Sequence, residues 1–445
     1  MHLKKHKLFK NKYPFLLSFA LTGIVFQVSV YSTILEIGHK EKIDLVWQVV
    51  YREFLDPEDD FNKRDWMKLR KKLLSKKYLD TQDAYNSIKE MLASLNDPYT
   101  RFMDPSEFNQ MKIDLSGELI GVGIQIAKDE KDDLIIISPI EGSPAIEAGI
   151  KPQDKIISID DNPTKGMSIE KAVQLIRGKK GTKVKLEILR KDTILLKSLL
   201  RKTIRIKSVS SKINSSKDGY LIGYLRVNKF GEKTSDELKE ILIDLEKKDM
   251  SGYVLDLRWN PGGSLQSSID ISRHFIDKGT IVSTLTKDGL KDVKKGTGIS
   301  LTQKPLVVLV NKGSASASEI VSGAIKDNKR GKLVGEKTFG KGLVQNMKPL
   351  GDGSAVTLTI AKYLTPNGTD INKFGITPDI KVKMNINPIR QSDIGTRKDK
   401  QYKAGEKELI NIIKMKDQIS NFNPTTSNLN AFIKINKENK VFSLN

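Results

Sequence analysis

Apolar residues recur every three or four positions in three stretches near the start of the chain, residues 43–54, 65–74 and 81–95. This spacing gathers them on one face of a helix. The first stretch contributes Ile43, Val46, Trp47, Val50 and Phe54. We therefore expect residues 33–110 to form a helical region whose apolar faces pack together and which carries no chemistry.

From residue 111 the pattern changes to short apolar stretches separated by glycine. Strict alternation, as in the last of these stretches, is typical of a half-buried strand. Strands are predicted at 121–126, 134–138, 155–159 and 183–190, and helices at 144–148 and 168–177. Residues 111–203 are thus expected to form a separate domain of strands with two helices.

Residues 204–385 alternate strand-length apolar stretches with helical ones. Strands are predicted at 220–227, 253–257, 306–310, 333–335 and 355–363, and helices at 235–247 and 316–326. Such alternation favours a layered α/β core. The polar residues 386–445 contain one helical stretch, 406–414, and are expected to form a peripheral tail. The sequence as a whole predicts a multidomain α+β and α/β protein.

The first 32 residues have the composition of an export signal. Five lysines precede residues 13–26, an apolar run without charge, and Ser32 offers a small residue for cleavage. An uncleaved membrane anchor is the alternative, because apolar character continues to about Tyr31 and approaches the length of a membrane span. In either case the body of the protein is expected on the far side of a membrane from the site of synthesis.

Composition excludes several classes of protein. The formal net charge is +22, but the lysines outside the leader are interspersed with acids, whereas nucleic-acid binding needs a clustered basic patch. The charge is compatible with attraction to an anionic membrane surface. The chain has no cysteine and four histidines, two of them in the leader. Disulfides, a thiolate nucleophile and a structural zinc site are therefore not expected, and no metal or cofactor is implied.

Three loops rich in glycine and serine follow or adjoin predicted strands of the α/β segment, where such sheets place their sites. They are residues 256–264, 313–319 and 340–342. Gly262 and Gly263, at a helix start, present backbone N–H groups suited to an oxyanion hole. In the second loop Ser314, Ser316 and Ser318 are each candidate nucleophiles, and helix capping is the alternative for any one of them.

A lysine is a better candidate for the catalytic base than a histidine. His39 and His274, the histidines outside the leader, do not lie in turn-rich segments. Lys341 is flanked by glycines that let it approach another backbone closely. Its pKa, ordinarily ~10.4, would have to fall by roughly 3 through burial for it to accept a proton at neutral pH. In an extended segment Gln345 lies on the same side and can orient the neutral amine.

A second candidate site is the turn Gly121-Val122-Gly123-Ile124. A Gly-X-Gly turn before a strand leaves backbone N–H groups free to converge on an anion such as a chain-terminal carboxylate. A tight turn without a ligand is the alternative. The strand order of this segment, together with the phrase Gly142-Ser143-Pro144-Ala145, resembles a PDZ domain. That resemblance implies a peptide-binding site at Gly121, Val122, Gly123 and Ile124.

Over residues 44–380 the motifs together resemble the carboxyl-terminal processing proteases, also called tail-specific proteases. They include Asp97-Pro98-Tyr99-Thr100, Asn260-Pro261-Gly262-Gly263, and residues 313–319, 338–345 and 363–368. The resemblance implies a layered ClpP/crotonase-like α/β serine protease core. In such a core Ser316 is the nucleophile, Lys341 is the base and Gln345 is its partner.

The same resemblance implies further roles. The oxyanion N–H groups would come from Ala317 and from Gly262 or Gly263. Arg177, in the PDZ segment, would couple peptide docking to the active site.

The N-terminal sequence motifs are similar to those of family members from oxygenic photosynthetic organisms. Some of these trim the photosystem II reaction-centre D-one precursor in the thylakoid lumen, and paralogues act as general periplasmic proteases.

We expect an exported serine endopeptidase that captures protein substrates by their exposed C-termini. A non-catalytic PDZ scaffold and an acyl-CoA-type hydratase are the alternatives. The intact Ser316, Lys341 and Gln345 set weighs against the scaffold, and the peptide-groove domain weighs against the hydratase. The oligomeric state stays open.

Overall fold

The computed structural model describes residues 38–384 and 390–420 of the 445-residue chain. The predicted export signal or anchor, residues 1–32, lies outside the described residues. Within the described ranges, no helix combines the length and the apolar character needed to cross a membrane.

The three predicted N-terminal helices are present. They are α1 (His39–Glu53), α2 (Lys63–Ser75) and α3 (Thr81–Ala93). The side chains of Asn62 and Asp80 cap α2 and α3 by accepting hydrogen bonds from first-turn N–H groups. Trp47 of α1 stacks on Trp66 of α2, with ring centroids 6.4 Å apart. Helical spacing of apolar residues therefore identified these elements correctly.

Two short elements follow the three helices. The strand β1 (Arg101–Met103) lies inside the region predicted to be helical, and α4 (Pro105–Ser116) crosses the predicted boundary at residue 110. A three-residue strand is too short to show alternation, and it forms because it pairs with β18 (Ala355–Leu364).

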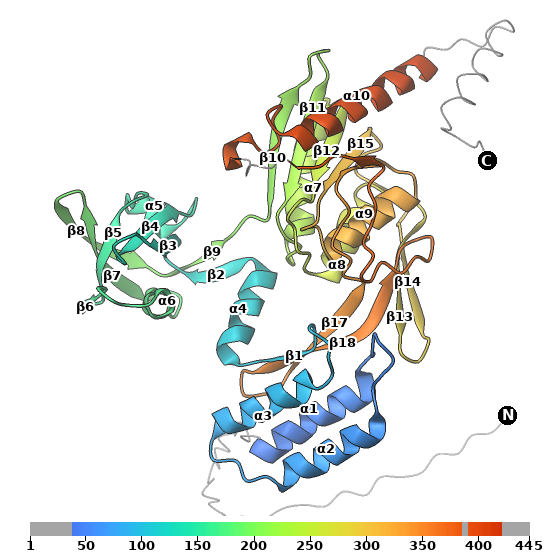
Figure 1. The fold of residues 1–445 in the computed structure, drawn as a ribbon. Helices are drawn as coiled ribbons and strands as arrows, with labels where there is room; N and C mark the ends of the chain where they lie inside the picture. Colours follow the sequence, from blue (N-terminus) through green and yellow to red (C-terminus); the bar gives the residue numbers. More distant parts are fainter. Residues whose placement is uncertain (1–37, 385–389, 421–445) are drawn as a thin grey trace, which may run out of the picture.

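The next domain has its own apolar core and stands apart from the rest of the molecule (Figure 1). Its sheet has the order β3-β4-β5-β7-β8, with β6 paired to β5. These elements are β3 (Ile124–Lys128), β4 (Leu134–Pro139), α5 (Pro144–Glu147), β5 (Lys155–Ile159), β6 (Asn162–Pro163), α6 (Ile169–Ile176), β7 (Lys183–Arg190) and β8 (Thr193–Leu200). A two-stranded ribbon of β2 (Glu118–Gly121) and β9 (Lys202–Arg205) connects the domain to the rest of the chain.

The α/β core is built on a six-stranded sheet with the order β10-β11-β12-β15-β16-β19. Its strands are β10 (Val209–Ser215), β11 (Leu221–Val227), β12 (Gly252–Asp256), β15 (Leu306–Val310), β16 (Lys332–Gly335) and β19 (Ile380–Lys381). All pairs except β10–β11 are parallel. One face packs on α7 (Thr234–Glu246), α8 (Leu265–Arg273) and α9 (Ala317–Asp327). The predicted layered α/β core is confirmed.

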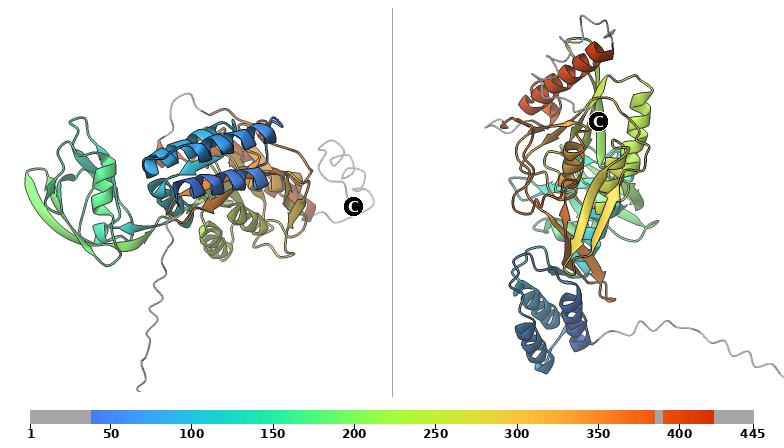
Figure 2. Two further views of the ribbon diagram at one scale, coloured as in Figure 1. Left: turned by 90° about the horizontal axis from the view of Figure 1, so that it is seen from below. Right: turned by 90° about the vertical axis from the view of Figure 1, so that its right-hand side faces the viewer.

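The opposite face of this sheet is covered by α10 (Lys400–Ser420), which follows a short 3-10 helix, Gln391–Asp393. Tyr402, Leu409 and Ile413 of α10 are buried against Val254 and Val307 of the sheet. The prediction of a peripheral tail from residue 386 is therefore wrong for this helix. The right-hand view of Figure 2 shows α10 and the α1–α3 bundle at opposite ends of the molecule.

A second sheet joins this core to the N-terminal helices. Long β18 pairs on one side with β1 and β13 (Thr280–Thr286), and on the other side with β17 (Leu343–Pro349). The strand β14 (Lys291–Lys295) pairs antiparallel with β13 and forms the edge of this sheet. Val356 and Leu358 of β18 are buried under α1 to α3. The sheet thus places β17, which starts just after Lys341, between the helical bundle and the core.

Candidate active site

The serine-rich turn connects the buried strand β15 to α9, and its three serines have different environments. Ser314 and Ser318 are fully buried and donate their hydroxyls to the carbonyls of Leu257 (2.8 Å) and Asn260 (2.9 Å). Ser316 is only partly buried and has φ of 54°, a left-handed conformation that is strained for a residue with a side chain. The structure thus distinguishes serines that the sequence left equivalent, and Ser316 alone is both strained and accessible.

Glu319 connects this turn to the loop that carries Lys341. Its fully buried carboxylate accepts hydrogen bonds from the backbone N–H of Ser316 (2.9 Å), of Gly340 (2.8 Å) and of Lys341 (2.9 Å), and from the Thr338 hydroxyl (2.6 Å). One oxygen, Oε2, binds the N–H groups of both Ser316 and Lys341. A single acidic side chain therefore fixes the two backbones against each other.

Sequence reasoning did not assign Glu319 a role. The available signal was its position three residues after Ser316, the spacing at which an acid can reach back to the start of a helix.

Tyr363 of β18 provides a second connection between the two loops. Its hydroxyl donates toward the backbone carbonyls of Ser316 (3.1 Å) and Lys341. The side chain is almost completely buried, so this bridge is shielded from water.

The Lys341 side chain lies in an apolar, half-buried position. Its Nζ is 4.4 Å from the centroid of the Tyr99 ring. Burial lowers the pKa of Lys341, with the charge of Asp97 opposing and that of Arg101 reinforcing this effect. No carboxylate forms an ion pair with Lys341 anywhere in residues 38–384 or 390–420. Burial therefore makes the neutral amine more accessible than in a lysine exposed to water.

The side chains of Ser316 and Lys341 are not hydrogen-bonded to each other in the described part of the chain. Glu319 holds their backbones together, while no hydrogen bond joins their functional groups in the described residues. Gln345 donates to Thr359 Oγ1 at 3.5 Å rather than to the lysine amine. The register between β17 and β18 shifts at this point: Val344 pairs with Ala361 and Gln345 with Thr359, so the extra residue lies on β18.

The glycine loop lies directly against Ser316. A Cβ on Gly262 would lie 2.8 Å from Ser316 Cβ and 3.0 Å from the Ala317 nitrogen. The Gly262 N–H itself donates to Asn260 Oδ1 at 2.9 Å. Within the described residues no acceptor is found for the N–H groups of Gly263 and Ala317. Of the two glycines, Gly263 is therefore the one with a free donor.

A buried charged network supports the same loop. Arg258, 1% exposed, forms paired hydrogen bonds with Asp256 (2.9 and 2.6 Å) and with Asp399 (2.9 and 2.6 Å). Burial alone would raise the pKa of Asp399, but the hydrogen bonds and charge of Arg258 lower it. Sequence reasoning missed this network because Asp399 lies in the segment predicted to be peripheral.

The peptide-binding residues predicted for the glycine-punctuated domain lie where β2 leads into β3. Gly123 has φ of 79°, and a Cβ there would lie 2.2 Å from Ser143 Cβ, so only glycine fits. The carbonyls of Val122 and Gly123 accept from the backbone of Ala145 (3.0 Å) and Ile140 (2.9 Å). The strand β3, which begins at Ile124, is at the edge of its sheet, which suits it to pair with an extended peptide.

Arg177 lies at the end of α6. Its guanidinium donates to Gln110 Oε1 of α4 at 3.1 Å. It therefore contacts the helix between the two domains, not the Ser316 turn.

Comparisons with known proteins cover both the glycine-punctuated domain and the α/β core. Residues 110–189 match the PDZ domain profile, and residues 221–382 match the profile of peptidase family S41. The chain is 42% identical over 361 residues to a carboxyl-terminal-processing protease of Synechocystis sp., covering 80% of this chain and 84% of the relative. The chain belongs to peptidase family S41. It is a serine-type peptidase of the carboxyl-terminal-processing group, and it carries a PDZ domain.

Other members of the group are similar over most of their length. The carboxy-terminal processing protease CtpA of Bacillus subtilis is 43% identical over 323 residues, covering 72% of this chain and 67% of that protein. The solved structure titled photosystem II D1 C-terminal processing protease shares 34% identity with a TM-score of 0.52, over 78% of this chain and 93% of that one. The resemblance to this family and its PDZ-containing fold, inferred from the motifs, is confirmed.

Proposed function

We propose that this protease cleaves peptide bonds with a Ser-Lys dyad, in which Ser316 is the nucleophile and Lys341 the general base. The observation that carries the proposal is Glu319 Oε2, which accepts hydrogen bonds from the backbone N–H groups of both residues. Burial without a carboxylate partner supports a neutral Lys341, the form able to accept a proton.

The reaction follows from these positions. Lys341 Nζ takes the proton of Ser316 Oγ as Oγ attacks the scissile carbonyl, and the oxyanion receives hydrogen bonds from the free N–H groups of Gly263 and Ala317. The lysine then gives its proton to the leaving amine, which leaves an acyl-enzyme on Ser316. Water, deprotonated by the same lysine, hydrolyses the ester. Since the two side chains are not hydrogen-bonded in this structure, substrate binding is expected to bring them into hydrogen-bond distance, as catalytic hydrogen bonds often tighten only in the complex.

The proposal extends to substrate choice. We infer that the Gly121–Ile124 turn and the edge of β3 hold the C-terminus of a protein substrate, so that the segment removed is a C-terminal extension. The lysine-rich, apolar composition of residues 1–32 supports export to the periplasm or the thylakoid lumen. The photosystem II D1 precursor is the proposed substrate, on the strength of the similarity to a protease titled for that protein.

The test compares Ser316→Ala and Lys341→Ala with the parent on a peptide carrying the C-terminal extension of the D1 precursor. Both variants should fold, as judged by circular dichroism, and should lose cleavage by at least about 10³-fold. Amidating the peptide's C-terminus should raise KM while leaving kcat nearly unchanged, because it removes the docked carboxylate. Full cleavage by Ser316→Ala would refute the dyad, and cleavage of unrelated exported proteins alone would indicate a general processing protease.

A further inference from the structure

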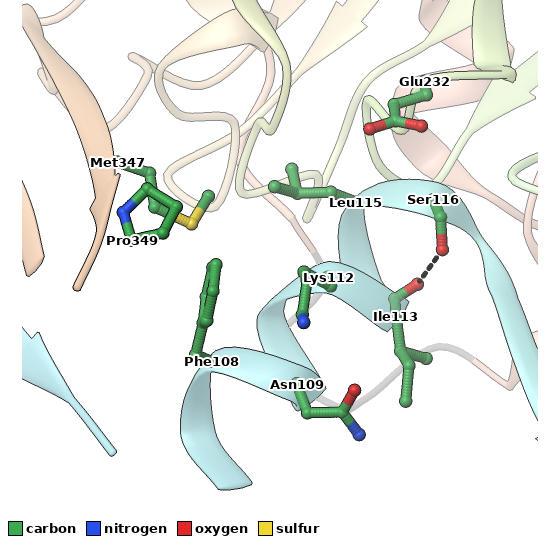
Figure 3. A pocket seen from close by; sticks show the side chains of 9 residues that line it. All are labelled: Phe108, Asn109, Lys112, Ile113, Leu115, Ser116, Glu232, Met347 and Pro349. Atoms are coloured by element: carbon green, nitrogen blue, oxygen red, sulfur yellow. Dashed lines mark hydrogen bonds between the residues drawn. The ribbon is translucent and has the colours of Figure 1, made fainter. Parts of the chain in front are cut away.

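A cavity of about 560 Å³ lies between α4 and β17 (Figure 3), and Ser316 and Lys341 are not among its lining residues. Its floor is apolar: Phe108 and Leu115 come from α4, and Met347 and Pro349 come from β17. The charged groups in its lining, Lys112 and Glu232, have opposite signs, so the cavity as a whole does not select a charged ligand. Its chemistry suits an apolar side chain.

The strand that lines this cavity has an open edge. Within the described residues β17 pairs only with β18, so the backbone groups on its other side remain available. Such an edge is a template for an additional extended strand. Pro349 has no N–H to donate to an added strand, so the part of the β17 edge that can pair ends there.

The cavity also lies on a route between the two candidate sites. The strand β17 begins two residues after Lys341. On the other wall, α4 ends at Gly117 and leads into β2, which runs into the Gly121–Ile124 turn. With a rise of ~3.3 Å per residue, the six residues from Lys341 to Met347 span about 20 Å. An extended polypeptide would cover that span with the same number of residues.

We propose that the open edge of β17 and the adjoining cavity form a second docking site for the substrate polypeptide. The occupant is the extended segment between the cleaved bond and the C-terminus held by the PDZ domain. It lies along β17 and places one apolar side chain, about six residues after the cleaved bond, in the cavity that Phe108 and Met347 line. This inference rests on the proposed function, because the placement of both ends of the substrate depends on it.

The test measures binding to full-length Ser316→Ala protein, which does not turn over. Labelled Ala/Ser peptides with a free C-terminus carry either leucine or aspartate at the position about six residues after the expected cleavage bond. The leucine peptide should bind about tenfold more tightly than the aspartate peptide, the effect of one well-placed apolar side chain. Asn109→Trp, which fills the cavity, and Met347→Glu, which charges it, should each abolish that preference.

Asp114→Trp is the matched control, since Asp114 is exposed on the same helix but does not line the cavity. It should keep the full preference. Equal binding of the two peptides by the parent, or an equal loss of preference in the control, would overturn the inference. So would a change of oligomeric state in Asn109→Trp, because it would indicate that a second copy of the chain occupies the cavity.

The same peptides separate this inference from the proposed function. If the chain with Ser316 intact cleaves both peptides equally well and neither cavity variant alters binding, the dyad stands and the docking site fails. If binding depends on leucine and on the cavity while Lys341→Ala still cleaves, the docking site stands and the dyad fails.

Discussion

At the scale of single residues, the environment of Lys341 should set the pH range of activity in the proposed dyad. Burial lowers its pKa, the Asp97 carboxylate raises it and the Arg101 guanidinium lowers it. A general base acts when deprotonated, so kcat/KM should rise with pH through this pKa. We expect that rise to be centred below the ordinary value of a lysine, ~10.4.

Two substitutions should move the midpoint of that rise in opposite directions. Asp97→Asn removes a negative charge that favours the protonated amine, so the midpoint should shift to lower pH. Arg101→Gln removes a positive charge that disfavours it, so the midpoint should shift to higher pH, by a smaller amount because Arg101 is exposed. Full pH profiles of kcat/KM for the three proteins give the measurement, and shifts of the same sign would contradict the assignment of Lys341 as base.

The carboxylate of Glu319 should matter for rate more than for binding. Glu319→Gln replaces an acceptor oxygen with an NH₂ donor that faces backbone N–H groups, so one loop must move away from the other. Because displacement by about 1 Å can cost roughly 10²-fold, we expect kcat to fall by that order with KM little changed. Glu336→Gln, in the same loop region, is the control and should retain the parent's kcat. A change confined to KM would argue against a positioning role.

Gly262 should tolerate no side chain. Its φ is 102°, and an added Cβ would lie 2.8 Å from the Ala315 carbonyl oxygen and from Ser316 Cβ. Gly262→Ala should therefore combine backbone strain of about 1–3 kcal/mol with displacement of Ser316, and should lower both the unfolding temperature and kcat.

Gly166→Ala is the matched control for that substitution. Its φ is 75°, with nothing within 4 Å of the added atom, so only the strain should remain. Calorimetry and steady-state kinetics should show a lowered unfolding temperature with unchanged kcat. Unchanged kcat in Gly262→Ala would contradict the proposed role of Ser316, against which the glycine loop packs.

At the scale of elements, α10 shows why some parts of the site could not be read from the sequence. Its buried residues Tyr402, Leu409 and Ile413 are spaced by seven and four positions, but lysines between them dilute the apolar pattern. Asp399, just before it, binds Arg258 across 141 positions of sequence. No local pattern encodes such a partnership, because it exists only once α10 packs on the sheet.

Breaking that partnership should destabilise the core. Asp399→Ala would leave Arg258, 1% exposed, with one carboxylate instead of two, and loss of one member of a buried ion pair costs about 3–5 kcal/mol. Urea unfolding should show a midpoint shifted accordingly. Asp393→Ala is the control, since Asp393 lies 3.8 Å from an exposed Lys398 and such pairs contribute about 0–1 kcal/mol. Equal shifts in the two variants would contradict the network's structural role.

Other elements were predictable because their signals are local. The spacing of Ile43, Val46, Trp47 and Val50 defined α1, and all four are buried. The serine turn and the glycine loop were recognised from composition alone, because small residues are needed where backbones approach closely. The hydrogen bond expected between Gln345 and Lys341 was not found in the described residues. Gln345 instead faces Thr359 of β18, a cross-strand partner that no local pattern in the sequence specifies.

At the scale of the whole molecule, the PDZ domain is attached by a narrow connection. The β2–β9 ribbon and α4 link it to the core (Figure 1). Glu118 of β2 pairs with Lys233 of the core and with Arg205 of β9. Beyond that contact, the Leu115 carbonyl accepts from Glu232 N–H at 2.8 Å, and the Phe230 N–H donates to the Gly262 carbonyl at 2.9 Å. The domain connection therefore lies within a few residues of the glycine loop.

The way Glu319 holds the two loops has a consequence for biosynthesis. Residues 316 and 341 are drawn together by one carboxylate that is buried only when α9 and the strand after Lys341 are both in place. In a newly made chain, residues 316 and 341 cannot be held together until both of these elements have folded. In the proposed mechanism, cleavage activity should therefore arise late in maturation, so that chains that have not finished folding do not cleave other proteins.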